Sequence, residues 1–365
     1  MVVGGVVMPE IGPIAAPALT DLVGAMLTAA GVVPEEAALV AAHVVDAEER
    51  ESRSQGLVRV PPYVKWARTG EIASPTRVTV VHDGGAALVL DAHNGWGHVA
   101  AGDALGRCVE RATQTGVCFA TVRNTNHIGR LGRYVETAAA RGMIGLIACA
   151  GNPQSSWVAP WGGTAPIFGT NPIAIGFPRG DGPPIVVDIS TTQGARGNVL
   201  LAQKMRQLLP EGWAFDAAGA PTRDPHQALP PHGTLAPLGG HKGYALAVAV
   251  EILCGVLGGV WPPESSANFV GAIRVEAFLP REAYDRGLAG LVAEIKGVPP
   301  RAGVDEIRLP GEGSAARKQR STARGLHVPS GLWCELIELA RSLNVEHPLA
   351  QLVPTATDGG AKEAM

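Results

Sequence analysis

Short apolar runs with the length of strands alternate along this chain with longer stretches of helical periodicity. The strand-like runs lie at 117–122, 144–148, 173–177, 185–189 and 268–275, and a Gly84-Gly85 turn centres a hairpin at 77–91. Helical periodicity covers 17–52, with a second helix beginning at Pro34, and returns at 99–115, 131–141, 243–257, 280–296 and 330–343. Because strands and helices interleave throughout, the sequence predicts the α/β class.

The Gly-rich fingerprint of the usual dinucleotide-binding fold is missing. No Gly-x-Gly-x-x-Gly follows a strand and opens a helix, and Gly129-Arg130-Leu131-Gly132 and Gly239-Gly240 are only partial imitations. The connections are also irregular, without a run of equally spaced βαβ units. If this protein binds NAD(P), we therefore expect it to do so with another fold.

The composition argues against several classes of protein. Of the 365 residues, 46% are hydrophobic and 17% are charged, which is typical of a folded chain long enough for two domains. With a net charge of −3 and no long Lys/Arg stripe, the chain lacks the basic footprint of a nucleic-acid-binding protein. The most apolar stretch, 244–260, is short for a membrane span, and the N-terminus lacks the basic segment of a signal peptide. Five widely spaced cysteines indicate a reduced, cytoplasmic protein.

A histidine follows one of the predicted strands. His127 lies in Asn124-Thr125-Asn126-His127-Ile128-Gly129, between the strand that ends at Val122 and the helix that begins at Leu131. Imidazole can accept or donate a proton near neutral pH, as the oxidation of an alcohol or the reduction of a carbonyl requires. The alternative is a histidine that caps the helix or binds a loop carbonyl.

Two further polar segments accompany predicted strands. The first, Phe168-Gly169-Thr170-Asn171-Pro172, is by itself only a tight turn. The second, Asp188-Ile189-Ser190-Thr191-Thr192, places an acid and three hydroxyls after an apolar run. These groups could bind a ribose or orient a histidine, and the alternative is a helix N-cap or an Asx-turn.

Two cations stand in positions that suit an anionic ligand. Lys242 lies in Leu238-Gly239-Gly240-His241-Lys242-Gly243-Tyr244, which opens a long apolar helix. A lysine is mildly unfavourable at the positive end of a helix, whereas a phosphate or carboxylate fits there. Arg59 could grip a carboxylate with two parallel hydrogen bonds, and the alternative is a surface ion pair with a residue such as Glu51.

Other kinds of site have little support. Asp91, His93 and His98 are too loosely spaced to indicate a metal site, so we expect none. The Gly-x-Ser-x-Gly turn of many hydrolases does not occur in the chain.

In this order, the motifs resemble the type-2 malate/L-lactate dehydrogenase-like family, which includes ureidoglycolate dehydrogenase, diketogulonate reductase, sulfolactate dehydrogenase and piperideine-2-carboxylate reductases. The resemblance runs from about residue 17 to residue 340. It rests on 126–132, 159–163, 169–174, 188–192, 210–213, 221–225, 238–244 and 309–312. It implies a non-Rossmann mixed-sheet NAD(P)-binding domain at 116–304 and a helical, substrate-facing domain formed by 1–115 with 305–365.

The resemblance also implies partners and roles for single residues. The family uses NAD or NADP on small carboxylate substrates and forms homodimers with the active site near the interface. It implies that His127 is the catalytic acid/base and that Arg59 holds the substrate carboxylate. Asp188, which could orient His127, and Gln55, at the position of a family histidine, are expected in the catalytic group. Ser54, Thr170 and Asn171 are expected beside the substrate. Cofactor contacts are expected from Asp188, Ile189, Ser190, Thr191, Thr192, Gly194, His241, Lys242, Pro310, Gly311 and Glu312.

One departure from the family pattern leaves the function open. Family members usually read Ser-His-Gly where this chain has Ser54-Gln55-Gly56. Glutamine can donate a hydrogen bond, but it cannot deliver a proton. Three functions therefore stay open. The chain could be a 2-hydroxy/2-oxo acid dehydrogenase in which His127 alone exchanges the proton, or a reductase of cyclic or N-alkyl 2-imino acids. It could also be a nucleotide-binding relative with weakened catalysis.

Overall fold

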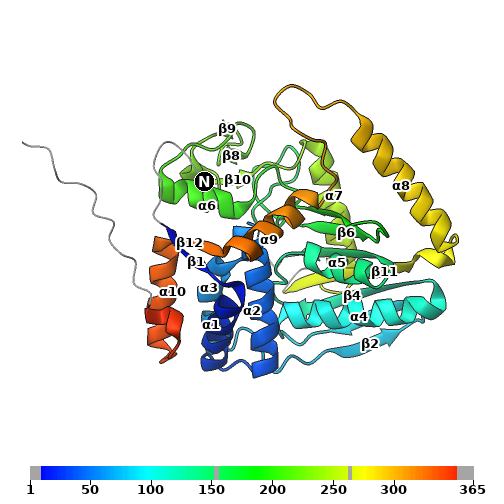
Figure 1. Cartoon of the computed structure of the whole chain (residues 1–365). Helices are drawn as coiled ribbons and strands as arrows, with labels where there is room; N and C mark the ends of the chain where they lie inside the picture. Colours follow the sequence, from blue (N-terminus) through cyan, green and yellow to red (C-terminus); the bar gives the residue numbers. More distant parts are fainter. Residues whose placement is uncertain (1–9, 152–155, 262–264, 352–365) are drawn as a thin grey trace, which may run out of the picture.

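A mixed seven-stranded sheet forms the centre of the protein in a computed structural model that describes residues 10–151, 156–261 and 265–351 (Figure 1). The strands run in the order β2 (Thr79–Asp83), β3 (Ala87–Asp91), β4 (Val117–Thr125), β11 (Ser266–Arg274), β5 (Met143–Ala150), β6 (Ile173–Phe177) and β7 (Ile185–Ile189). Strands β3 and β4 pair in parallel, and the other neighbours in this sheet pair antiparallel. The protein is therefore an α/β protein without the parallel sheet of a Rossmann fold, which confirms the predicted class.

Helices cover both faces of this sheet. Strand side chains alternate between the faces, so Ile147 and its neighbour Ala148 belong to different apolar clusters. On the face of Ile147 lie α4 (Gly97–Thr115) and α5 (Gly132–Ala140). On the other lies α7 (His241–Glu251), which a π-helical turn extends over Ile252–Val256. Helices therefore bury both faces of the large sheet.

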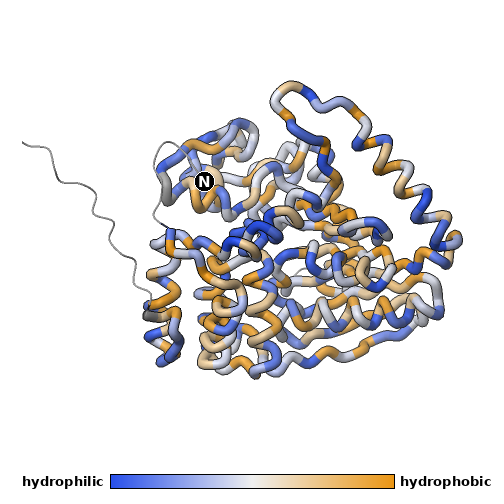
Figure 2. Tube along the Cα trace, viewed as in Figure 1, coloured by the Kyte–Doolittle hydropathy of each residue, from blue (hydrophilic) through white to orange (hydrophobic). Residues whose placement is uncertain are grey.

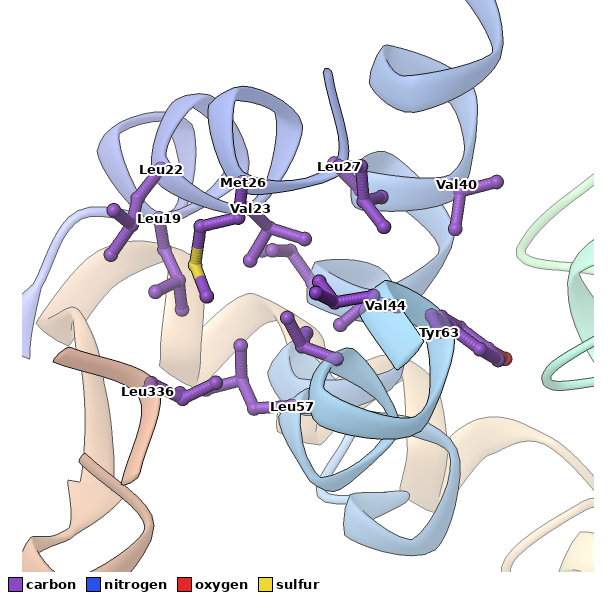
Figure 3. Packing of buried hydrophobic residues seen from close by; sticks show 14 of the residues in the cluster. Leu19, Leu22, Val23, Met26, Leu27, Val40, Val44, Leu57, Tyr63 and Leu336 are labelled. Carbon is purple, nitrogen blue, oxygen red and sulfur yellow. The ribbon is translucent and has the colours of Figure 1, made fainter. Parts of the chain in front are cut away.

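The two ends of the chain pack together in a helical cluster beside the sheet. It contains α1 (Ala16–Ala29), α2 (Pro34–Glu49), α3 (Val60–Thr69) and α10 (Ser330–Ser342), with a two-stranded sheet of β1 (Glu10–Ile14) and β12 (Leu326–Pro329). Figure 3 shows Leu19 and Leu27 of α1 facing Val44 of α2, with Leu336 of α10 below them. Burial of these side chains is what joins the N- and C-terminal segments.

A small sheet and further helices lie outside the large sheet and the helical cluster. The small sheet, in the order β10 (Gly233–Leu235), β8 (Ala214–Asp216) and β9 (Pro221–Thr222), packs against α6 (Arg196–Met205). Helix α9 (Glu312–Arg324) crosses α2, and Arg317 donates a hydrogen bond to the carbonyl of Arg50. Helix α8 (Arg281–Gly297) stands away from the body with only Val292 buried, and its exposed surface mixes apolar and polar residues (Figures 1 and 2).

The predicted strands, the hairpin and the predicted helices are confirmed within a few residues. The segment 54–59, for which no helix or strand was predicted, forms two short 3-10 helices, and the helix α3 that follows it was not predicted either. Elements α6 and β8–β10 were not predicted. The division into two domains stays a prediction. Strands β2 and β3, which lie in the predicted helical domain, belong to the large sheet, and α4 packs on that sheet. Within the described ranges, no helix is long and apolar enough to cross a membrane.

Candidate active site

Two consecutive 3-10 helices between α2 and α3 carry Ser54, Gln55 and Arg59. The first spans Arg53–Gln55 and the second Leu57–Arg59. Gly56 joins them so closely to the buried Glu48 that a Cβ atom there would collide with the Glu48 carboxyl. The Arg59 Nε donates a hydrogen bond to the Ser54 carbonyl oxygen at 2.7 Å. The turn thus fixes Arg59 through its Nε and leaves the guanidinium end for another partner.

His127 follows the last residues of β4 and is partly buried. Its Nδ1 lies 2.5 Å from the hydroxyl oxygen of Tyr63, a buried residue of α3. Burial lowers the pKa of His127 well below its ordinary value, and the charge of Arg59 lowers it further. Arg59 is the N-cap of α3, one turn before Tyr63, so the contact between Tyr63 and His127 brings these two predicted residues into one site.

A second arginine, which the sequence analysis did not single out, joins the same site. Arg196 lies over the Trp157 ring, 4.2 Å from its centroid, and its Nε is buried without a hydrogen-bond partner. Burial and the charge of Arg59 both lower its pKa. The following residue, Gly197, packs against Ser54, where an added Cβ would lie 2.7 Å from the Ser54 Cβ. The one sequence signal that could have pointed to Arg196 is its position two residues after the segment 188–194.

Asp188 and Asn171 contact other parts of the protein. The Asp188 carboxylate accepts a hydrogen bond from the Gly132 amide at the start of α5, at 2.8 Å. The hydrogen bonds recorded for Asp188 and His127 do not join the two side chains, so it is Tyr63 that contacts the histidine ring.

The Asn171 side chain is buried and holds α7. It donates to the Ala247 carbonyl at 3.1 Å and to Glu251 at 2.8 Å, and its Oδ1 has no partner. Thr170, its neighbour, accepts hydrogen bonds at its carbonyl oxygen from the amide and hydroxyl of Thr191. Thr170 therefore ties this loop to the segment expected to bind the cofactor.

Hydrogen bonds connect the segments expected to bind a cofactor to β7 or to one another. The Leu238 amide donates to the Thr191 carbonyl at 2.9 Å, and the Gly239 amide donates to the Gln193 side chain at 3.2 Å. The Val186 amide, near the start of β7, donates to the Pro310 carbonyl at 3.0 Å. Segments 188–194 and 238–242, although far apart in sequence, thus lie side by side after β7, whereas 310–312 contacts the start of this strand.

The chemistry of these segments suits a dinucleotide. His241 and Lys242 are exposed at the N-terminus of α7, which has neither a side-chain cap nor an acidic residue in its first turn. Such a helix end together with a lysine is a favourable place for a phosphate. The hydroxyls of Ser190 and Thr192 lie 2.9 Å apart on the adjoining turn. We therefore find that the residues present fit the phosphates and hydroxyls of NAD(P).

Four of the other expected cofactor residues differ in their contacts and exposure. The Glu312 carboxylate accepts hydrogen bonds from the Leu309 amide and from Lys296, so it is already engaged at the start of α9. Gly311 adopts a φ of 93° close to Val186, where a side chain would be strained. Ile189 is exposed and Gly194 is buried against Trp213. Among the described residues, no cluster of three or more His, Cys, Asp or Glu side chains could hold a metal ion.

These features are the ones expected of an NAD(P)-dependent oxidoreductase that is built without a Rossmann fold. The chain belongs to the malate/L-lactate dehydrogenase family, whose sequence pattern matches residues 14–337.

Named relatives and solved structures agree with this assignment. The chain is 36% identical over 323 residues to an L-lactate dehydrogenase of Cupriavidus necator, covering 85% of this chain and 92% of the relative. It is 35% identical over 329 residues to a Δ1-pyrroline-2-carboxylate reductase of Burkholderia ambifaria, covering 86% and 93%. The sulfolactate dehydrogenase structure from Methanocaldococcus jannaschii superposes with a TM-score of 0.83 at 32% identity, covering 91% of this chain and 98% of that one.

Proposed function

We propose that this protein transfers a hydride between NAD(P) and the carbon next to the carboxylate of a small 2-hydroxy or 2-oxo acid, with His127 as the acid/base. The observation that carries the proposal is the position of Arg59 one helical turn before Tyr63, whose hydroxyl lies 2.5 Å from His127 Nδ1, so that an anion-binding cation and a proton-exchanging ring share one site. Arg59 would hold the substrate carboxylate, and Arg196 offers a second cation for the same ligand.

Bound NAD(P) would supply or accept the hydride, and the residues of the protein do the rest. Arg59 and Arg196 orient the anionic substrate so that its α-carbon is fixed in the site. His127 exchanges a proton with the α-oxygen as the charge on that oxygen changes. Segments 188–194 and 238–242 would hold the dinucleotide through hydroxyls, backbone amides and Lys242.

The test is His127→Ala in the full-length protein, with His226→Ala as control because His226 is exposed on the loop of the small sheet. We expect kcat/KM for a 2-oxo acid to fall about 10²- to 10⁴-fold in the first variant, the usual contribution of a general acid/base. The second variant should match the wild type. Oxidation of NADH and NADPH is followed by absorbance, and unchanged turnover in His127→Ala would remove this residue from the mechanism.

A reductase of cyclic or N-alkyl 2-imino acids is the second candidate. It is favoured by Gln55, whose Oε1 is buried without a partner and which has no proton to deliver. A protonated imine already carries its activating proton, so the missing histidine would matter less. Comparison of kcat/KM for 2-oxo acids and for cyclic imino acids separates the two. Cofactor binding without turnover on either panel would indicate instead a relative with weakened catalysis.

We also propose that the protein is a cytoplasmic homodimer. Large apolar side chains are exposed on the π-helical turn and on α8, among them Ile252, Leu257 and Leu291. A second copy of the chain would cover such surfaces. All five cysteines are free, as a reducing compartment favours. Light scattering during gel filtration should give twice the chain mass of 37.7 kDa, and a monomeric mass would refute the dimer.

A further inference from the structure

Behind His127 lies a buried pair, Tyr63 and His98, to which neither the sequence motifs nor the proposed function gives a role. Tyr63 is fully buried and His98 is 1% exposed. Figure 3 shows Tyr63 at the edge of the helical apolar cluster, with its hydroxyl directed away from the apolar side chains. That hydroxyl lies 2.5 Å from His127 Nδ1 and 3.4 Å from His98 Nε2. One phenol oxygen therefore stands between two imidazoles.

The groups around His127 indicate which ring nitrogen carries its hydrogen. The Gly129 amide points at His127 Nδ1 at 3.4 Å, and an amide N–H can only donate. If Nδ1 accepts, the Tyr63 hydroxyl also donates to it, and the Tyr63 oxygen is free to accept from His98 Nε2. The remaining nitrogen, His98 Nδ1, is buried and has no hydrogen-bond partner among the described residues. In this arrangement Nδ1 carries a lone pair, and burying an unpaired lone pair costs less free energy than burying an unpaired N–H.

All three side chains are uncharged near neutral pH in this arrangement. Burial lowers the pKa of His98 to about 3, with smaller effects of Arg133 and Arg59 in the same direction. Burial raises the pKa of Tyr63 far above its ordinary value, although Arg59 opposes the shift. His98 then donates to Tyr63 and Tyr63 donates to His127, and such a chain of uncharged groups suits an apolar setting.

We propose that Tyr63, supported by His98, is a positioning residue that holds neutral His127 with Nδ1 as acceptor and the Nε2 hydrogen facing the ligand. No hydrogen bond is recorded for His127 Nε2 among the described residues, and it is not one of their buried unpartnered atoms. A neutral imidazole N–H can then donate a hydrogen bond to the oxygen or nitrogen of the reducible bond and give it the Nε2 proton as the hydride arrives. The ring left behind is an imidazolate, which the nearby charge of Arg59 favours over an imidazolium, and it takes the proton back in the oxidation direction.

Nuclear magnetic resonance of the full-length chain labelled with ¹⁵N-histidine tests this assignment without any substrate. His127→Ala identifies the signals of His127. In the wild type, we expect a lone-pair shift for Nδ1 and a protonated shift for Nε2, and in Tyr63→Phe a mixture of the two neutral forms. Tyr134→Phe is the matched control, because it removes another buried tyrosine hydroxyl, which bonds the Ile128 carbonyl at 2.7 Å. A protonated Nδ1 in the wild type, or an unchanged spectrum in Tyr63→Phe, overturns the proposal.

Kinetics provide the second arm, which rests on the proposed function. Tyr63→Phe should lower kcat about 10²-fold, the usual effect of a misplaced catalytic group, with a smaller change in KM. His98→Leu should lower kcat about tenfold, as for one neutral hydrogen bond, and His98→Gln, which keeps a side-chain N–H, should restore most of it. Equal losses in Tyr63→Phe and Tyr134→Phe would assign the effect to stability and refute the positioning role. A wild type without turnover would refute the proposed function, while the spectra would still decide the role of Tyr63.

Discussion

Glu48 is an acid buried beneath the turn that carries Gln55 and Arg59, and its replacement should change how stability depends on pH. Its side chain is among the buried charged groups, and its Oε2 has no hydrogen-bond partner. Burial raises the pKa of Glu48 from 4.5 to about 7, although Arg53 and the Leu57 amide act in the opposite direction. The folded protein therefore holds a proton that the unfolded chain has released over much of this range.

The sign of the effect follows from which state binds more protons. Below pH 4.5 both states are protonated and Glu48 has no effect on stability through its charge. As the pH rises towards 7, the unfolded state ionises first and is stabilised, so the free energy of unfolding falls by about 1.4 kcal/mol per pH unit. Over the interval between the two pKa values this amounts to about 3 kcal/mol, and above pH 7 the loss stays constant.

Glu48→Gln removes this titration. We expect the difference in free energy of unfolding between the variant and the wild type to move in favour of the variant by about 3 kcal/mol between pH 4.5 and pH 8. Guanidinium denaturation at a series of pH values measures it, with Glu294→Gln on the exposed face of α8 as control. A difference that stays flat across this range would mean that the Glu48 pKa is ordinary in the folded protein and would refute the reasoning.

Three further outcomes test single contacts. Asn171→Ala should cost about 1–3 kcal/mol of stability, because it leaves Glu251 and the Ala247 carbonyl without their donor, and should leave the substrate KM unchanged; a raised KM would return Asn171 to the substrate site. Gly243→Ala should weaken NAD(P)H binding in fluorescence titrations, because the added Cβ would lie 2.7 Å from the Thr191 carbonyl oxygen, and equal affinity would contradict the placement of the cofactor. Arg59→Met should raise the pKa of His127 in an NMR titration, since the charge of Arg59 lowers it, and an unshifted curve would separate the two residues.

The sequence was sufficient for the elements whose side chains repeat regularly. Strands β4 to β7 and helices α4 and α5 could be predicted because a buried face imposes a period on each of them. Strands of two or three residues, such as Pro221–Thr222, are too short to show any period, so the small sheet was missed. Helix α3 was missed although Pro61 lies at its first turn, where proline favours a helix start.

The site could be predicted only where its residues belong to one continuous motif. His127, Arg59 and the 188–194 turn were proposed in this way, and their roles stay predictions. Tyr63 and His127 are 64 positions apart, and nothing in either local sequence indicates that a hydrogen bond joins them. His98 was considered only as a metal ligand with Asp91 and His93, whereas the fold turns it inward against Tyr63. Such pairs arise from the packing of α3 and α4 against the end of β4, which the sequence does not encode locally.

The cations of this protein fall into two groups, and the contrast supports an anionic ligand. At the junction of α2, α5 and α9, Asp46 binds Arg50 at 3.2 Å, Arg130 at 3.1 Å and Lys318 at 2.5 Å. Burial alone would raise the Asp46 pKa, yet these cations hold it well below its ordinary value, and Glu136 and Glu49 pair with the same cations, so their charges are balanced within the junction. Arg196, in contrast, has a buried Nε with no hydrogen-bond partner in the described part of the chain. Burial and the charge of Arg59 lower its pKa, which means that both disfavour its charged form. Holding two partly buried like charges in one site is unfavourable, and a bound carboxylate is the group that would relieve it.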